Sequence, residues 1–261
     1  MSSSDKGLEP RRALTRPAGP AKLHRLARQP THSPRPVDLT QLLLVAPVLL
    51  FSLVAHEYAH GYAALRQGDA TAYQLGRLTW NPIKHIDPFM TVLVPVMLAL
   101  AGGPIFGGAK PVPIEPRNFR RYRRGDIIVS LAGVATNFAL VPVCALLFVL
   151  FGVAGQQLPA LTPSFAILQT MARYGVIVNL VLAVFNLLPL PPLDGSRVFK
   201  YLLPPAWAIQ YQNLGRFGFL LLFALLYLGG GVLRAWIAPA YRVDASIMRV
   251  IGAFVLPNPL A

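Results

Sequence analysis

The chain has 261 residues, of which 54% are hydrophobic and 13% are charged, and its mean hydropathy is +0.52. Such an apolar and charge-poor composition excludes an ordinary soluble domain and predicts a membrane protein. The formal net charge of +14 does not indicate a nucleic-acid-binding protein, because the Lys and Arg residues lie in the N-terminal segment and in the loops between apolar runs. Membrane orientation explains basic residues at those places.

The N-terminal residues 1–37 differ from the rest of the chain. They carry eight Lys or Arg residues, several prolines and no apolar run, so we predict a basic, Pro- and Arg-rich disordered tail. Residues 38–261 form the predicted membrane domain. Cys144, the one cysteine, lies in an apolar run and is expected to be a small buried residue. A single cysteine also excludes a disulfide framework and a CxxC metal site.

Four apolar stretches approach or exceed the roughly 20 residues that cross a bilayer as a helix. They are residues 39–65, 127–153, 165–190 and 217–232. Between the first two, residues 70–88 are mixed and interrupted by prolines, residues 90–101 are apolar but short, and the glycines and prolines of residues 102–113 exclude a simple helix. A basic run, residues 117–124, precedes the second long helix, and residues 217–232 are predicted to be a further spanning helix.

The first predicted helix carries an HExxH motif. Two histidines four residues apart, His56 and His60, face the same side of a helix, so both imidazoles can reach one ion. Glu57 is then placed to act on a water molecule at that ion. Of the three glutamates in the chain, only Glu57 lies in an apolar segment, where an unpartnered carboxylate is costly. The alternative is a buried His–Glu network that ties helices together.

A catalytic zinc ion usually takes three protein ligands, so a third must come from elsewhere in the chain. Asp194 is the best candidate, because it is predicted to close an apolar helix after a proline-broken stretch, where Gly195 allows close backbone approach. Its alternative role is that of an aspartate in a Pro-Leu-Asp-Gly turn. His85, Asp87 and Asp126 are weaker candidates, because loops and helix entries favour solvated or capping roles.

Four sequence blocks resemble those of a known family. They are His56-Glu57-Tyr58-Ala59-His60-Gly61, residues 76–88 beginning Gly-Arg-Leu-Thr-Trp-Asn-Pro, residues 108–113 (Gly-Ala-Lys-Pro-Val-Pro), and residues 186–195 (Asn-Leu-Leu-Pro-Leu-Pro-Pro-Leu-Asp-Gly). A fifth block, residues 132–137, is similar to the family's Ala-Gly-Pro-x-x-Asn pattern but has Val134 in place of the proline. On these blocks the chain resembles the site-2 proteases, the intramembrane zinc metalloproteases of peptidase family M50. No segment resembles the PDZ or CBS domains that some relatives carry.

The resemblance implies an activity and roles for individual residues. With His56 and His60, Asp194 is expected to hold one Zn²⁺ per chain, and Glu57 is expected to be the catalytic base. Asn186 is expected to position the substrate or steady the oxyanion, and Asn137 is retained as a further catalytic residue. The implied function is that of an endopeptidase that cuts in or near the transmembrane segments of single-span or membrane-associated proteins.

The expected fold is an all-α polytopic helical bundle of about five to six membrane segments in the cell membrane. Metal binding requires the histidines and Asp194 at one depth, so the first and third long helices should run parallel. Residues 90–110 are then predicted to form a re-entrant or partly inserted element whose broken backbone is covered by protein or water. Short β elements are expected near the active site.

The same arrangement predicts an orientation in the membrane. The basic run at 117–124 and the residues Arg197 and Lys200 fall on one face, which positive charge assigns to the cytoplasm, so the active site should open there. The loops at residues 80–88 and 102–113 are candidates for a gate, because a substrate helix must unwind before its amide is attacked. A strand from these loops could clamp the unwound substrate.

Two other functions fit the same residues. A metal-ion or proton transporter could use intramembrane His, Glu and Asp side chains as its path, and it predicts flux that survives loss of Glu57. A catalytically inactive relative would keep the fold as a membrane binding partner but lose a ligand. All the expected ligands are present in the sequence, which argues against the inactive relative.

Overall fold

The computed structural model describes residues 39–93 and 108–257. The predicted basic tail and most of the predicted re-entrant element lie outside this part of the chain, so both stay predictions. The described residues are mainly helical and contain no strand. They therefore do not confirm the short β elements expected near the active site.

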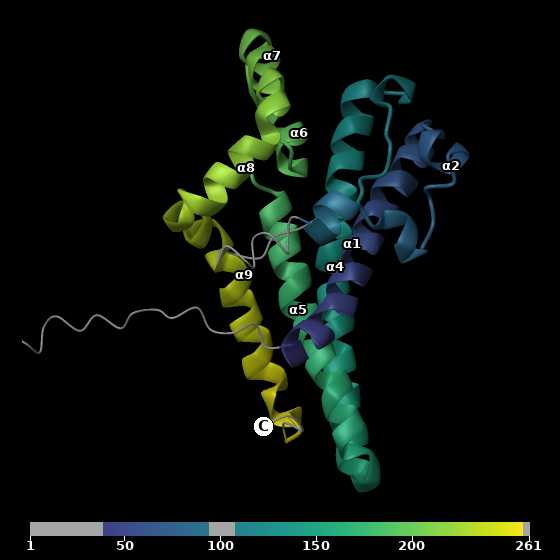
Figure 1. The fold of residues 1–261 in the computed structure, drawn as a ribbon, viewed down its shortest axis with the longest axis vertical. Coiled ribbons are helices and arrows are strands. Elements are labelled where there is room, and N and C mark those ends of the chain that lie inside the picture. The colour runs from purple at the N-terminus through teal and green to yellow at the C-terminus, as the bar shows by residue number, and fades with distance from the viewer. Residues whose placement is uncertain (1–38, 94–107, 258–261) are drawn as a thin grey trace, which may run out of the picture. The chain divides into compact units, whose positions relative to one another are not determined.

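Four long helices form the body of the structure, and shorter helices connect them (Figure 1). The long helices are α1 (Leu39–Gln67), α4 (Tyr122–Gln157), α5 (Thr162–Asn186) and α9 (Gly230–Ile251). The shorter α-helices are α2 (Thr71–Gln74), α6 (Asp194–Phe199), α7 (Pro205–Asn213) and α8 (Gly218–Tyr227). Single turns of other helix types are η2 (Pro82–His85), η3 (Pro88–Leu93), η4 (Pro116–Asn118), η5 (Pro159–Leu161), η6 (Lys200–Leu202), η7 (Leu214–Phe217) and η8 (Gly252–Phe254).

Three of the described helical segments are long and apolar enough to cross a membrane, namely α1, α4 and the segment from η5 through α5. Large apolar side chains on their outer faces are not covered by protein; Leu43 is 66% exposed and Leu146 is 59% exposed. Lipid tails are the natural neighbours of such leucines, because exposing this much apolar surface to water would cost free energy. The prediction of a helical membrane protein is confirmed.

The fourth predicted span is wrong as a single helix. Residues 217–232 do not run straight, because α8 ends at Tyr227 and α9 begins at Gly230, and the two helical segments on either side of this break are bent by 85°. The break falls at consecutive glycines, residues 229–231, which are poor helix formers. The bent pair counts as at most one further span, which gives up to four in the described residues.

The contacts between α1 and α5 fix their relative direction. Val48 packs against Gly175, and four residues further along each helix the Ser52 hydroxyl accepts a hydrogen bond of 3.0 Å from the Asn179 amide. Residue numbers therefore rise in the same direction along both helices, so α1 and α5 run parallel. This is the direction predicted from placing the histidines and Asp194 at one depth. The helix α4 lies against both and runs in the opposite direction, and its Asn137 amide donates to the Asn179 side chain at 2.8 Å.

Helix α9 packs along α5 in the antiparallel direction (Figure 1). Arg173 on α5 makes two hydrogen bonds, of 2.6 and 2.7 Å, to the carboxylate of Asp244 on α9. Further along, the Trp236 indole donates to the Val184 carbonyl at 2.8 Å. Charged side chains within apolar helices are costly unless partnered, and this bidentate pair supplies the partners and sets the register of α9.

A buried carboxylate joins the end of α1 to the segment before α4. Asp69 is 0% exposed and accepts hydrogen bonds from the Glu115 N–H at 2.7 Å, the Asn118 amide at 2.9 Å and the Thr71 N–H at 3.1 Å. Burial alone would raise the pKa of Asp69, but the hydrogen bonds from Asn118, Thr71 and Glu115 outweigh it and lower the pKa below its ordinary value.

Asp69→Asn is expected to destabilise the protein by about 1–2 kcal/mol at neutral pH, because the hydrogen bonds to a charged acceptor are weakened. A pKa that is lower in the folded state gives stability that is fully present above the unfolded value of about 3.9 and is lost as the pH falls through the folded value. Thermal unfolding in detergent micelles should therefore separate the variant from the wild type at pH 7, and the difference should shrink below pH 4. An equal difference at both pH values would contradict this role.

Candidate metal centre

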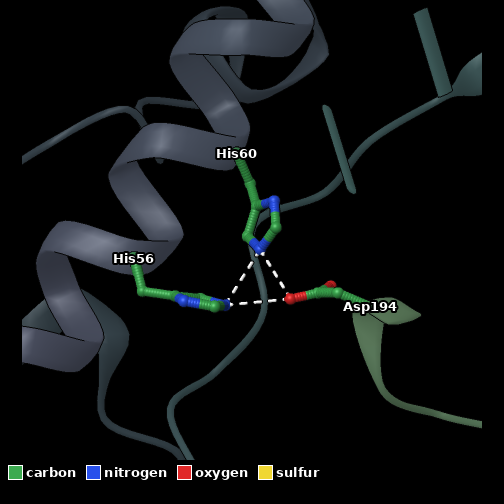
Figure 2. Close-up of side chains that lie close together, drawn as sticks. All are labelled: His56, His60 and Asp194. Carbon is green, nitrogen blue, oxygen red and sulfur yellow. Dashed lines mark hydrogen bonds and ion pairs between the residues drawn. The ribbon is translucent and has the colours of Figure 1, made fainter. Parts of the chain in front are cut away.

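Three side chains from two helices point at one another in the interior (Figure 2). His56 and His60 lie one turn apart on α1, and Asp194 is the first residue of α6. The Nε2 atoms of the two histidines are 3.0 Å apart, and an Asp194 carboxylate oxygen lies 3.1 Å from His56 Nε2 and 3.2 Å from His60 Nε2. Ligands that surround zinc tetrahedrally at about 2.0–2.1 Å are separated by roughly 3.3 Å, so these spacings match three corners of such a site.

The outer nitrogens of the two histidines determine which atoms face the centre. His60 Nδ1 is 2.7 Å from the Val129 carbonyl, and His56 Nδ1 is 2.6 Å from the Asn137 side-chain oxygen. Both contacts require a proton on Nδ1, which leaves each Nε2 as a lone pair in the neutral ring. Two lone pairs and a carboxylate therefore converge. A shared proton would satisfy one pair of these atoms, whereas a metal cation satisfies all three.

A glycine on α4 leaves room in front of the cluster. A Cβ at Gly133 would lie 2.5 Å from His60 Nε2 and 2.6 Å from His56 Nε2, closer than the 3.0 Å that real Cβ contacts keep. The space that any side chain at this position would fill is therefore the space beside both metal-facing nitrogens. The donor set and this cradle fit a zinc ion.

Asp194 reaches the cluster from a different position than predicted. It does not close α5, which ends at Asn186, but opens the short helix α6 after the proline-rich turn. Gly195 makes the approach possible, because a Cβ there would lie 2.3 Å from the Leu187 carbonyl oxygen. The close backbone approach expected at this glycine is thus present, while the helix assignment was wrong.

Glu57 is held beside the cluster by a backbone donor from a distant loop. The Val112 N–H donates to a Glu57 carboxylate oxygen at 2.8 Å. Val112 stands between Pro111 and Pro113, which have no N–H, so it supplies the only backbone donor of this tripeptide. A single donor fixes one carboxylate oxygen and leaves the other available for chemistry.

Val112→Pro is expected to lower the rate of the peptide hydrolysis that the resemblance implies by about tenfold or more, because the hydrogen bond that orients the Glu57 carboxylate is lost. Val112→Ala keeps the N–H and is the matched control, which should retain most of the activity despite a smaller side chain. The measurement is kcat for a membrane peptide with bound zinc determined in parallel. Equal losses in both variants would show that packing, and not the donor, is what matters at this position.

The cluster opens into a small cavity of about 160 Å³. Asn186 lines it together with Glu57, and its Nδ2 donates to the Leu182 carbonyl at 3.0 Å, which leaves one amide hydrogen and the amide oxygen for a ligand. Ser130 also lines the cavity, and its buried hydroxyl has no hydrogen-bond partner in the described part of the chain. Sequence reasoning missed Ser130, since a serine in an apolar helix gives no distinguishing signal.

Asn137 does not reach the cavity, because it is fully buried behind His56. Its oxygen accepts from His56 Nδ1, and its amide contacts Asn179 and the Ser52 carbonyl. The direction of these bonds fixes the tautomer of His56. Asn137 therefore has the geometry of a residue that positions a ligand and not of one that contacts the substrate.

The three weaker ligand candidates stay away from the cluster, but the roles expected for two of them were wrong. His85 is 0% exposed and not solvated, and its Nε2 contacts the Thr79 carbonyl at 2.9 Å. Asp126 does not cap a helix entry, because α4 begins at Tyr122 and Asp126 lies buried in its second turn. Asp87 lies in the loop before η3. In the described residues, only His56, His60 and Asp194 form a group able to hold a metal.

Asp126 joins the start of α4 to the segment after α6. The Lys200 ammonium lies 2.6 Å from its carboxylate, and the Tyr201 hydroxyl donates to it at 2.8 Å. Burial and the neighbouring carboxylate raise the pKa of Tyr201 well above its ordinary value, so the hydroxyl remains a donor. Lys200 also lies over the Tyr201 ring, 4.9 Å from its centroid. These contacts fasten α6 against α4 and so help to hold Asp194 in place.

The fold and this site define a membrane-embedded helical metalloenzyme with an HExxH helix. Comparisons with known proteins agree. The profile of Peptidase family M50 matches residues 156–226, which include Asn186 and Asp194. The chain is 37% identical over 223 residues to YwhC of Bacillus subtilis (strain 168), which is named as a zinc metalloprotease, and the match covers 85% of this chain and 96% of YwhC.

A second relative extends the comparison. Rip2 of Mycolicibacterium smegmatis, also named as a zinc metalloprotease, is 30% identical over 184 residues, which are 70% of this chain and 66% of Rip2. No solved structure matches the chain. The chain belongs to peptidase family M50, and the prediction of a zinc-dependent intramembrane protease is confirmed.

Proposed function

We propose that the protein hydrolyses peptide bonds in or near the transmembrane segments of single-span or membrane-associated proteins. One Zn²⁺ per chain is held by His56, His60 and Asp194, and Glu57 is the catalytic base. The observation that carries this proposal is the convergence of two imidazole lone pairs and a carboxylate, with Glu57 and Asn186 on the wall of the same cavity.

The residues of this chain divide the reaction among them. A zinc ion held by His56, His60 and Asp194 would supply the Lewis acidity needed to activate a water molecule and polarise the scissile carbonyl. Glu57 takes a proton from the attacking water, and it passes this proton to the amine nitrogen as the C–N bond breaks, which leaves a carboxylic acid and a free amine. Val112 holds the Glu57 carboxylate through its N–H. The remaining amide hydrogen and the amide oxygen of Asn186 form hydrogen bonds with the substrate backbone. These bonds hold the scissile carbonyl in position beside Glu57.

The gate was predicted at residues 80–88 and 102–113, of which residues 102–107 lie outside the described part of the chain. We place it in the described loops 80–88 and 108–113, on the Glu57 side of the cluster. They are joined to one another, because the Lys110 N–H donates to the His85 carbonyl at 2.7 Å and Arg77 donates to the Lys110 carbonyl at 3.2 Å. Trp80 stacks on Tyr58 of α1 with ring centroids 4.6 Å apart. A substrate that displaces this stack moves both loops and reaches Glu57. The strand clamp predicted from these loops has few backbone donors to offer at residues 110–113, because the Lys110 and Val112 N–H groups already donate to His85 and Glu57.

The orientation follows from charge. The basic residues 117–124 with Arg197 and Lys200 face the cytoplasm, and the active site opens toward that side of the cell membrane. The sequence predicted about five to six membrane segments, and the described residues supply up to four of them. The partly inserted element predicted at residues 90–110 and the basic tail predicted at residues 1–37 lie mostly or wholly outside the described residues and stay predictions.

The experiment that tests the proposal measures cleavage and transport in the same liposomes. Purified protein is reconstituted with a panel of single-span peptides, the products are identified by mass spectrometry, and zinc and proton flux are recorded with encapsulated dyes. Zinc-dependent cleavage within or beside the membrane segment is expected, without flux. Zinc or proton flux in the absence of any cleavage would contradict the protease proposal and support the transporter function instead.

A further inference from the structure

A second cavity adjoins the catalytic one. Its volume is about 360 Å³, and the two cavities share Pro192 and Arg197 in their walls. Apolar surface comes from Pro191 and Pro192, and polar surface comes from Gln212 and from Tyr211, whose buried hydroxyl lies beside Ser196. The cavity has no part in the hydrolysis described above, but its shared wall places it next to any substrate that binds at the cluster.

Arg197 stands at the boundary between the two cavities. It lies three residues after Asp194 on α6, so the two side chains share one face of this helix. The residue is exposed, and in the described part of the chain its guanidinium makes no hydrogen bond or ion pair. Its five donors and its full positive charge are therefore free to bind a ligand.

The other cation of the second cavity is already neutralised. Lys200 pairs with Asp126 at 2.6 Å and its side chain is only 12% exposed. Arg197 is accordingly the one cation on this wall that lacks an anionic partner among the residues that the structure describes. An unpaired arginine beside apolar proline surface suits a side chain with a methylene stem and a terminal carboxylate, which the planar guanidinium can bind through two hydrogen bonds.

We propose that this cavity is a specificity subsite for an acidic side chain, Asp or Glu, that lies within a few residues of the scissile bond of the substrate. Arg197 binds the carboxylate, and Pro191 and Pro192 pack against its stem. The proposal rests on the proposed function, because the subsite is defined by its position beside the catalytic cavity. It predicts that substrates are selected by a charge next to the cut and not by apolar length alone.

The test uses pairs of single-span peptides that are identical except for Glu or its isostere Gln at one position, scanned over four residues on each side of the cut. Rates (kcat/KM) are measured with the full-length wild type, and binding is measured by fluorescence anisotropy with Glu57→Gln. We expect about a tenfold preference for Glu at one or two neighbouring positions, in both rate and binding. Arg197→Lys should keep much of the preference, and Arg197→Gln should reduce it to about one.

Charge reversal separates recognition from a general structural effect. Arg197→Glu should favour Lys over Glu at the same substrate position, which a merely structural role of Arg197 would not produce. Arg124→Gln, which removes an exposed arginine of the basic run, is the matched control and should leave the Glu/Gln ratio unchanged. Equal rates for Glu and Gln peptides at every position, or a preference that survives Arg197→Gln, would overturn the subsite. Failure of the wild type to cut any peptide would instead overturn the proposed function.

Discussion

Glu57→Gln is expected to lower the rate of peptide hydrolysis by about a thousandfold, while the protein keeps its zinc. The amide has nearly the shape of the carboxylate and can still accept the hydrogen bond from the Val112 N–H, so the loop and the cavity should stay in place. It cannot take a proton from water. The loss should therefore appear in kcat, with little change in peptide binding.

Glu115→Gln makes the same chemical change outside the site and serves as its control. The Glu115 side chain accepts a hydrogen bond from the Arg117 N–H and lies at the start of η4. Its replacement should leave the rate close to that of the wild type. The measurements are single-turnover cleavage of a membrane peptide and zinc content for each purified variant. If Glu57→Gln still cuts at a tenth of the wild-type rate or faster, Glu57 is not the base.

Gly133→Ala is expected to lower the affinity for zinc by roughly a hundredfold or more. Activity should be lost together with the bound zinc. The added methyl group would lie 2.5–2.6 Å from the atoms of both imidazoles that face the centre. The histidines would have to turn away, which would break their contacts to Val129 and Asn137. In an isolated helix the same substitution is favourable by about 1 kcal/mol, so the effect cannot come from helix propensity.

A control on the same helix adds one heavy atom where there is room. Ala135 lies two residues along α4 on its exposed side, and Ala135→Ser should bind zinc as the wild type does. Zinc content after dialysis measures metal binding in both variants, and circular dichroism shows whether each variant keeps its helical fold. A helical Gly133→Ala protein that retains full zinc would contradict the arrangement of α1 against α4.

The sequence was sufficient to predict the parts of the site that depend on local spacing. The i, i+4 spacing of His56 and His60 requires a shared helix face, and Gly195 beside Asp194 marks a place where backbone can approach closely. The parallel direction of α1 and α5 followed from bringing these residues to one depth, and the Ser52–Asn179 contact agrees with it.

Other features depend on how distant segments pack, which the sequence does not specify. Asp126 was expected to have a solvated or capping role at a helix entry, but it is buried where Lys200, 74 residues later, pairs with its carboxylate. The docking of residues 77–88 against residues 108–113 buries His85 in the same way. Gly133 becomes essential only once α4 lies against the HExxH helix. The break between α8 and α9 is different, because the three consecutive glycines at 229–231 signal it in the sequence.

The most direct test of the central claim is to measure bound zinc and peptide cleavage together while metal is removed and restored. Purified protein is stripped with a chelator, returned to increasing amounts of zinc, and assayed at each step on a single-span peptide. Cleavage should vanish in the stripped protein and rise in proportion to bound zinc until about one ion per chain is reached, and Asp194→Ala should show neither zinc retention nor cleavage. Cleavage that persists in the metal-free protein, or zinc retained at full affinity without Asp194, would contradict the claim.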